Sequence, residues 1–244
     1  MLRKESNVLG RTFRAAVVVL VATMAVGCVR PPRPTGYLDN YSRLERQRAP
    51  AMGVYAEPMA AAKRPRPDHV LQLLPSRWDA PRLPQPSREK ELLELLDKRL
   101  TIYVQRFAPS SVIVTRSRDV EDLLLLGANV TQLRLSITHT AKGFGPLRML
   151  LAGFYLGATE LQVEGQMVDC RTQRVLVRFA RRGLSNGVVF GLPTPQSLSP
   201  KFCWRLSIDE TAKMLAYYVV SQLRPPPPQW WKKPIPQSAN DKRP

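Results

Sequence analysis

The strongest constraint on the fold is the alternation of apolar and polar residues along 161–180, interrupted once by a polar turn. Alternation with a period of two is typical of strands with one buried face, and two such strands joined by a short turn form a β-hairpin. A loop at 170–172 predicts three opposed pairs: Val163 with Phe179, Met167 with Val175, and, on the other face, Glu164 with Arg178. A slip of one residue would exchange the two faces, so the pattern predicts this register.

Two long helices are predicted around this hairpin. In the first, Ser87 is the expected N-cap, Pro109 ends the helix, and the apolar residues recur at helical spacing: Leu92, Leu93, Leu96, Leu100, Val104 and Phe107. The last helix is predicted to begin with an S-x-x-E capping box at Ser207 and to end before Pro225. Its expected buried stripe is Ile208, Ala212, Leu215, Ala216, Val219 and Leu223.

The remaining elements are shorter. Residues 130–139 alternate, with Leu133, Leu135 and Ile137 on one face, which predicts a half-buried strand. Residues 69–74 and 111–115 are predicted strands, and residues 119–126 are a predicted short helix. The order of elements predicts an α+β domain over 87–224, with a mostly antiparallel sheet and helices packed on one face.

The flanking segments are rich in proline, which lacks a backbone amide and favours extended conformations. Residues 28–86 are therefore predicted to be an irregular tether and wrapping arm, in which the segment 36–44, with two tyrosines and two leucines, docks on the domain. Residues 225–244 form a basic tail with four consecutive prolines and a Trp-Trp pair. The tail is interpreted as disordered, or as an extended arm that presents its aromatic residues to a partner.

The first 27 residues have the pattern of a bacterial lipoprotein signal peptide. A basic start precedes a run of twelve uncharged residues at 15–26, which suits a signal peptide and is shorter than the roughly 20 residues of a membrane span. Small residues then lead to Cys28, the expected lipidation site and mature N-terminus. The absence of Asp after Cys28 favours the outer membrane, with a periplasm-facing domain; the inner membrane is the alternative.

Two stretches resemble a family of uncharacterised proteobacterial lipoproteins over about residues 28–224. The sequence GYLDNYS at 36–42 resembles the family's G-F-L-x-D-Y-S opening, and EGQMVDCRTQ at 164–173 is similar to its E-x-x-x-x-D-x-x-T-G hairpin. Gln173 stands where the family tends to have glycine. The resemblance implies an envelope lipoprotein and supplies no catalytic residues.

The candidate site residues are arginines and cysteines. Arg174, Arg178 and Arg182 alternate onto one face of the second hairpin strand, with Arg181 alongside. They predict either a basic patch for an anionic partner or a merely solvated face. Cys170 and Cys203 are a predicted disulfide pair, because an oxidising periplasm favours the pairing of two remaining thiols.

The glycine-rich apolar segment 143–158 is too short to span a membrane. It is interpreted as a connection packed on the sheet, with self-association or lipid contact as the alternative.

The chain carries a formal charge of +18, yet the secretion signal argues against nucleic acid as partner. Anionic lipid, lipopolysaccharide and peptidoglycan are the expected polyanions. With two histidines and no G-x-S-x-G motif, catalysis, a metal centre and a cofactor are not expected. The favoured function is binding or assembly by a lipid-anchored envelope protein; the alternatives are a peripheral subunit of a secretion or transport complex, and an envelope hydrolase.

Overall fold

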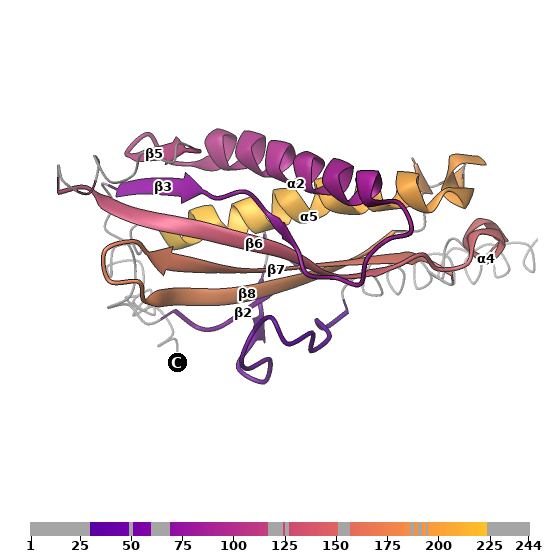
Figure 1. Ribbon diagram of the computed structural model, residues 1–244, viewed down its shortest axis with the longest axis horizontal. Coiled ribbons are helices and arrows are strands. Elements are labelled where there is room, and N and C mark those ends of the chain that lie inside the picture. Colours follow the sequence, from indigo (N-terminus) through magenta and orange to yellow (C-terminus); the bar gives the residue numbers. More distant parts are fainter. Residues whose placement is uncertain are drawn as a thin grey trace, which may run out of the picture.

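The fold is an eight-stranded open sheet with two long helices on one face (Figure 1). The computed structural model describes residues 30–48, 51–59, 69–116, 124, 127–150, 157–185, 188–189, 192–193 and 195–223. The strands of the sheet are β1 (Glu45–Arg46), β2 (Val54–Ala56), β3 (His69–Leu73), β4 (Arg77–Trp78), β5 (Val112–Thr115), β6 (Asn129–Ala141), β7 (Thr159–Asp169) and β8 (Val175–Ser185). The long helices are α2 (Pro86–Phe107) and α5 (Pro200–Leu223).

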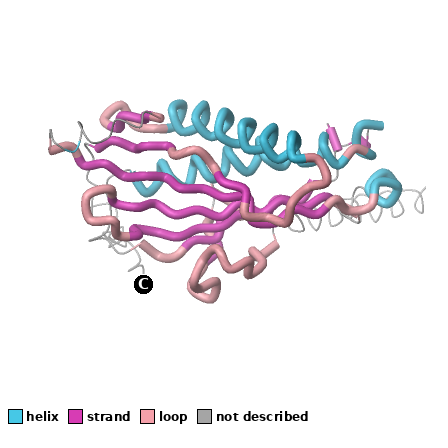
Figure 2. Tube along the Cα trace, in the orientation of Figure 1, coloured by secondary structure: helices cyan, strands magenta, loops and turns pink. Residues whose placement is uncertain are grey.

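Strands β6, β7 and β8 form a long antiparallel meander at the centre of the sheet (Figure 2). The order across the sheet is β1-β2-β8-β7-β6-β3-β5, and β4 pairs with β6 beyond the end of β3. Only the pairings of β3 with β5 and β6, and of β4 with β6, are parallel among those described. The predicted α+β class, with a mostly antiparallel sheet and helices on one face, is confirmed.

Strands β1 to β4 come from residues 28–86, which the sequence assigned to a tether and wrapping arm. The predicted start of the folded domain at 87 is therefore too late. The proline content misled the prediction because each of these strands is short enough to fit between prolines. Strand β3 matches the predicted strand at 69–74 closely.

The hairpin of β7 and β8 forms with a register that differs from the prediction by two residues. Val163 lies opposite Arg181, Met167 opposite Val177, and Glu164 opposite Ala180. The connection is longer than three residues, and the pairing shifts between Met167 and Val168. A slip of two preserves the faces, so Val163, Met167 and Phe179 are all buried in the core as expected.

Both long helices begin earlier than their predicted caps. The N-cap of α2 is Gln85, and Pro86 occupies the first turn, where a missing amide costs nothing. Helix α5 begins at Pro200, which leaves Ser207 in the helix interior, so the predicted capping box is wrong. The predicted buried stripe of α5 is confirmed in full, and Leu92, Leu96, Leu100 and Val104 of α2 are buried.

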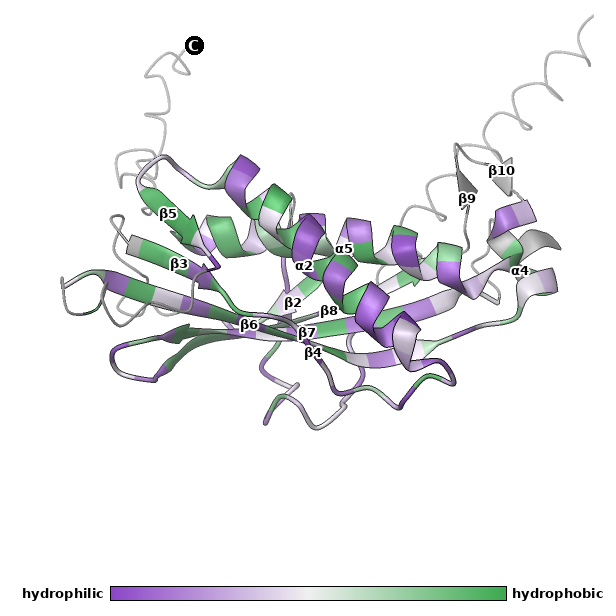
Figure 3. Ribbon diagram, turned by 45° about the horizontal axis from the view of Figure 1, so that its top comes forward, coloured by the Kyte–Doolittle hydropathy of each residue, from purple (hydrophilic) through white to green (hydrophobic). Residues whose placement is uncertain are grey.

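The main core lies between these two helices and the sheet (Figure 3). Its largest fully buried side chains include Trp204, Tyr218 and Phe179, and each contributes about 2–3 kcal/mol through burial of apolar surface. Gly183 allows a close approach of β8 to α5, because a Cβ atom there would lie 2.4 Å from the Ser207 hydroxyl.

The remaining described elements are α4 (Gly145–Leu150), β9 (Val188–Val189), β10 (Leu192–Pro193) and the 3-10 helix η3 (Pro195–Leu198). None of the described helices combines the length and the hydropathy needed to cross a bilayer. The signal peptide, the tail at 225–244, and the predicted helix at 119–126 apart from Leu124 lie outside the described residues. Part of the segment 143–158 also lies outside them.

Candidate functional site

The N-terminal arm, residues 30–44, packs on the polar face of the sheet, opposite the two helices. Leu38 is buried there, and Tyr41 donates a hydrogen bond of 2.6 Å to Glu164 of β7. The amide side chain of Gln162 accepts from the Arg33 backbone N–H and donates to the Arg33 carbonyl, both at 2.7 Å. The predicted docking of residues 36–44 is confirmed by these contacts.

Glu164 organises this contact because it is fully buried and receives four hydrogen bonds. The donors are Thr35, Tyr41, Thr138 and Gln162, at 2.6 to 2.7 Å. Such charge-assisted bonds are stronger than those between neutral groups. Two residues on the polar face of β6, Ser136 and Thr138, are also buried, although the sequence predicts an exposed face there. Thr138 bonds the arm-bound Glu164, and Ser136 bonds Asp79 and the Arg77 carbonyl.

A second carboxylate, Glu160, collects the positive charges near the start of the arm. Arg182 donates to it at 2.6 Å, and the side chains of Arg33, His139 and Arg30 lie 3.4, 3.5 and 3.6 Å away. Burial acts to raise the pKa of Glu160, but the bond from Arg182 and the nearby cationic charges together hold it below its ordinary value. Burial, and then the charge of Arg33, lower the pKa of His139.

The three arginines of the predicted basic patch do not form an open surface. Arg182 is 7% exposed and is bound to Glu160, while Arg178 pairs with Asp39 of the arm and with Glu57. Only Arg174 of the three is exposed. The prediction of an open basic patch is therefore wrong. Acidic side chains from the arm (Asp39), from β7 (Glu160) and from the residue after β2 (Glu57) neutralise two of the three arginines. Arg181 points to the opposite face, where it bonds Glu210 of α5 at 2.6 Å.

The predicted disulfide between Cys170 and Cys203 is not formed. Cys170 lies in the turn between β7 and β8, whereas Cys203 lies in the first turn of α5, toward the opposite end of the sheet (Figure 1). Trp204, next to Cys203, donates to the carbonyl of Glu160 near the start of β7, so the whole length of that strand separates the two thiols. Cys28, the expected lipidation site, lies outside the described residues.

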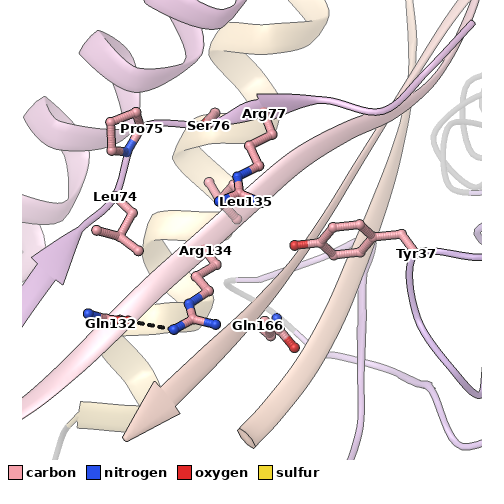
Figure 4. A pocket seen from close by; sticks show the side chains of 9 residues that line it. All are labelled: Tyr37, Leu74, Pro75, Ser76, Arg77, Gln132, Arg134, Leu135 and Gln166. Carbon is pink, nitrogen blue, oxygen red and sulfur yellow. Dashed lines mark hydrogen bonds between the residues drawn. The ribbon is translucent and has the colours of Figure 1, made fainter. Parts of the chain in front are cut away.

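A cavity on the arm-covered face has a volume of about 660 Å³. Its walls come from the arm, from the connection between β3 and β4, and from β6 and β7 (Figure 4). The lining residues are Tyr37, Leu74, Pro75, Ser76, Arg77, Gln132, Arg134, Leu135 and Gln166. This volume lies within the usual range of small-molecule sites.

Two guanidinium groups, two amides and one phenol line this cavity. Arg134 donates to the Gln132 amide oxygen at 2.8 Å and to that of Gln173 at 3.3 Å. Burial, and then the charge of Asp79, raise the pKa of Tyr37, so its hydroxyl stays protonated and able to donate. Figure 4 shows this hydroxyl and the Arg134 side chain directed toward the same space. The lining thus offers hydrogen-bond donors and positive charge.

Sequence reasoning singled out none of these residues as a site, although Tyr37 belongs to the segment that was predicted to dock. The residues that line the cavity with Tyr37 come from three other parts of the chain. The signal that was available is the polar face of the predicted strand at 130–139, where Gln132 and Arg134 alternate with the core leucines. Within the described part of the chain, no group of three or more His, Cys, Asp or Glu is placed to hold a metal ion.

No family model and no curated protein matches the chain. Three solved structures are similar to it over about two thirds of its length. The PelC dodecamer from Paraburkholderia phytofirmans has a TM-score of 0.39 at 7% identity, covering 66% of this chain and 96% of that one. A Xanthomonas campestris protein of family DUF330 has a TM-score of 0.37 at 10% identity, covering 63% and 84%. A neuraminyllactose-binding hemagglutinin homolog from Helicobacter pylori has a TM-score of 0.37 at 9% identity, covering 68% and 91%.

Proposed function

We propose that this protein is a lipid-anchored protein of the bacterial cell envelope that acts by binding or assembly, without catalysis. The signal-peptide pattern before Cys28 supports the lipid anchor. The residue after Cys28 is Val29 and not aspartate, which supports the outer membrane and a domain that faces the periplasm. The resemblance to uncharacterised proteobacterial lipoproteins at 36–42 points the same way.

The observation that carries the proposal is the docking of the arm directly behind Cys28. Only Val29 separates Cys28 from Arg30, whose guanidinium lies 3.6 Å from Glu160, and the backbone of Arg33 is held by Gln162. Two residues of extended chain span about 7 Å. An acyl chain on Cys28 would therefore place the Glu160 end of the sheet at the membrane surface, with little freedom to turn.

The surroundings of His139 favour binding over hydrolysis. A hydrolytic nucleophile needs a base within hydrogen-bond reach. The Nε2 atom of His139 faces Glu160, and among the described residues it makes no hydrogen bond with a hydroxyl or thiol. The cavity beside Tyr37 supplies polar groups for recognition instead.

Metabolic labelling with an alkyne fatty acid tests the anchor. We expect wild type and the control Cys170→Ser to incorporate the label and to fractionate with membranes, and Cys28→Ser to lose the label. Equal labelling of Cys28→Ser and wild type would refute lipidation at Cys28. Fractionation of the wild type on a density gradient then distinguishes the outer from the inner membrane.

A further inference from the structure

We propose that the cavity lined by Tyr37, Arg77 and Arg134 is a binding site for a small organic anion, a hydroxylated ring that carries a carboxylate or phosphate group. This proposal is independent of the lipid anchor, because it concerns only residues within the described domain. It rests on three observations: the charge state of the cavity, the unpaired polar groups that line it, and its apolar wall.

The two arginines of the cavity differ from the arginines of the protein that are paired with carboxylates. Eight arginines of the described residues form ion pairs with carboxylates: Arg30, Arg33, Arg99, Arg116, Arg178, Arg181, Arg182 and Arg205. Arg134 is instead half-buried and bonded only to neutral amide oxygens, and the guanidinium of Arg77 has no bonded partner among the described residues. The cavity therefore holds two positive charges that form no ion pair with any carboxylate of the described residues.

Three carboxylates near the cavity, those of Asp79, Glu164 and Asp97, already accept hydrogen bonds from other groups. Asp79 accepts a hydrogen bond of 2.6 Å from Ser136, and Glu164 receives its four bonds from the arm, β6 and β7. Asp97 binds Ser76, in the cavity wall, and Arg116. An anion in the cavity would thus meet the Arg77 guanidinium and the remaining N–H groups of Arg134, both able to donate charge-assisted hydrogen bonds to its oxygen atoms.

The remaining lining groups suit a ring that carries hydroxyl groups. The Tyr37 hydroxyl and the Gln166 amide make no hydrogen bonds within the described parts of the chain, so they are available to a ligand. Leu74, Pro75 and the Tyr37 ring provide apolar surface on the walls (Figure 4). Sites with mostly apolar walls and a few fixed polar groups are typical of small-molecule binding.

The test measures binding by isothermal titration calorimetry to the full-length protein, purified from membranes in a neutral detergent. The probes are glucuronate, glucose 6-phosphate and, as the uncharged match, glucose; dihexanoylphosphatidylglycerol below its micellar concentration serves as a lipid-headgroup probe. We expect an anionic probe to bind, glucose to bind at least about tenfold more weakly, and added salt to weaken the anion, as charge-assisted contacts require.

Three variants locate the binding. Arg77→Gln and Arg134→Gln should each weaken the anion about tenfold or more, because each removes one charged donor. Arg46→Gln is the matched control, since Arg46 is an exposed arginine of β1 outside the cavity. Far-UV circular dichroism and thermal unfolding establish that each variant is folded; Arg77 is exposed, so its variant keeps the test valid if Arg134→Gln unfolds.

Binding of a sugar anion that is lost in the cavity variants supports a soluble ligand, and selective binding of the lipid probe with the same losses supports a headgroup. Failure of all three anionic probes to bind at millimolar concentration would overturn the proposal. Binding that persists equally in Arg77→Gln and Arg134→Gln would also overturn it. Neither result bears on lipidation of Cys28.

Discussion

Tyr41 donates a 2.6 Å hydrogen bond to the buried carboxylate of Glu164, 123 residues further along the chain. The same hydroxyl oxygen lies 3.1 Å from the backbone amide of Thr35 and 3.3 Å from that of Leu38, both of which donate to it. One phenol thus fixes the fold of the arm and attaches it to the sheet. The arm is therefore an integral layer of the domain over this segment, although its sequence is rich in proline.

Replacement of Tyr41 by phenylalanine should release the arm. We expect Tyr41→Phe to lower the free energy of unfolding by roughly 2 kcal/mol, since one charge-assisted bond and the acceptor for two amides are lost. Hydrogen exchange followed by mass spectrometry should show faster exchange in residues 33–44. Tyr55→Phe is the control, because the Tyr55 hydroxyl has no hydrogen bond within the described residues. Unchanged exchange in the arm of Tyr41→Phe would contradict this role.

His139 should make stability depend on pH. Its folded-state pKa lies below the ordinary value of 6.5, through burial and then the charge of Arg33, so the unfolded chain takes up a proton before the folded one. This contribution to stability is fully present above pH 6.5 and is lost as the pH falls below it. Urea unfolding between about pH 7.5 and 5 should therefore show a steeper loss of stability for wild type than for His139→Gln. Identical pH slopes would disprove the assignment.

Gly183 should not tolerate alanine, because the added Cβ would lie 2.4 Å from the Ser207 hydroxyl and 3.1 Å from that of Thr211. We expect Gly183→Ala to destabilise the fold by about 1–3 kcal/mol, the usual cost of overpacking a core. Ser207→Ala alone should have a small effect, since it removes a buried hydroxyl that has no hydrogen-bond partner among the described residues. Combined with Gly183→Ala, the Ser207→Ala substitution should recover part of the lost stability. If the two changes in the free energy of unfolding, measured with denaturant, were strictly additive, a direct clash would be excluded.

The two thiols of the domain should both be available after unfolding. We expect non-reduced, denatured protein to react with a maleimide at Cys170 and at Cys203, as peptide mass mapping would show. In the native state, reaction at Cys170 should be slow and rise with pH, because burial raises the pKa of its thiol. If the denatured protein gained no label at either position, the two cysteines would be paired in a disulfide, contrary to the structure.

The sequence predicted elements whose pattern is local, and it failed where the deciding contact is distant. The stripe of α5 and the alternation of β6 are visible in the sequence, because burial repeats at every turn or every second residue. The start of α5 at Pro200 was missed because Ser207 and Glu210 carry a local capping pattern. In the fold, Ser207 instead packs against Gly183, and Glu210 binds Arg181.

The candidate site shows the same division. Arg174, Arg178 and Arg182 have the periodicity of a surface patch, but their neutralisation by Asp39, Glu57 and Glu160 depends on the path of the arm and on the two-residue shift of the hairpin. Conversely, Arg77 and Arg134 are 57 residues apart in sequence, so a local sequence pattern cannot show that they are neighbours in the fold. The pairing of β3 and β4 with β6 brings them to one cavity.

The arm also sets an order for folding. Its hydrogen bonds join residues 33–41 to residues 162–164, so they span more than half of the chain. Contacts of such separation carry a large loop-closure entropy and form slowly. A chain synthesised from its N-terminus produces the arm long before β7 exists to receive it. Once β7 is made, the carboxylates of Glu160 and Glu164 remain in water until the arm docks. We therefore expect the meander of β6, β7 and β8 to assemble first, and the earliest part of the chain to be the last to become native.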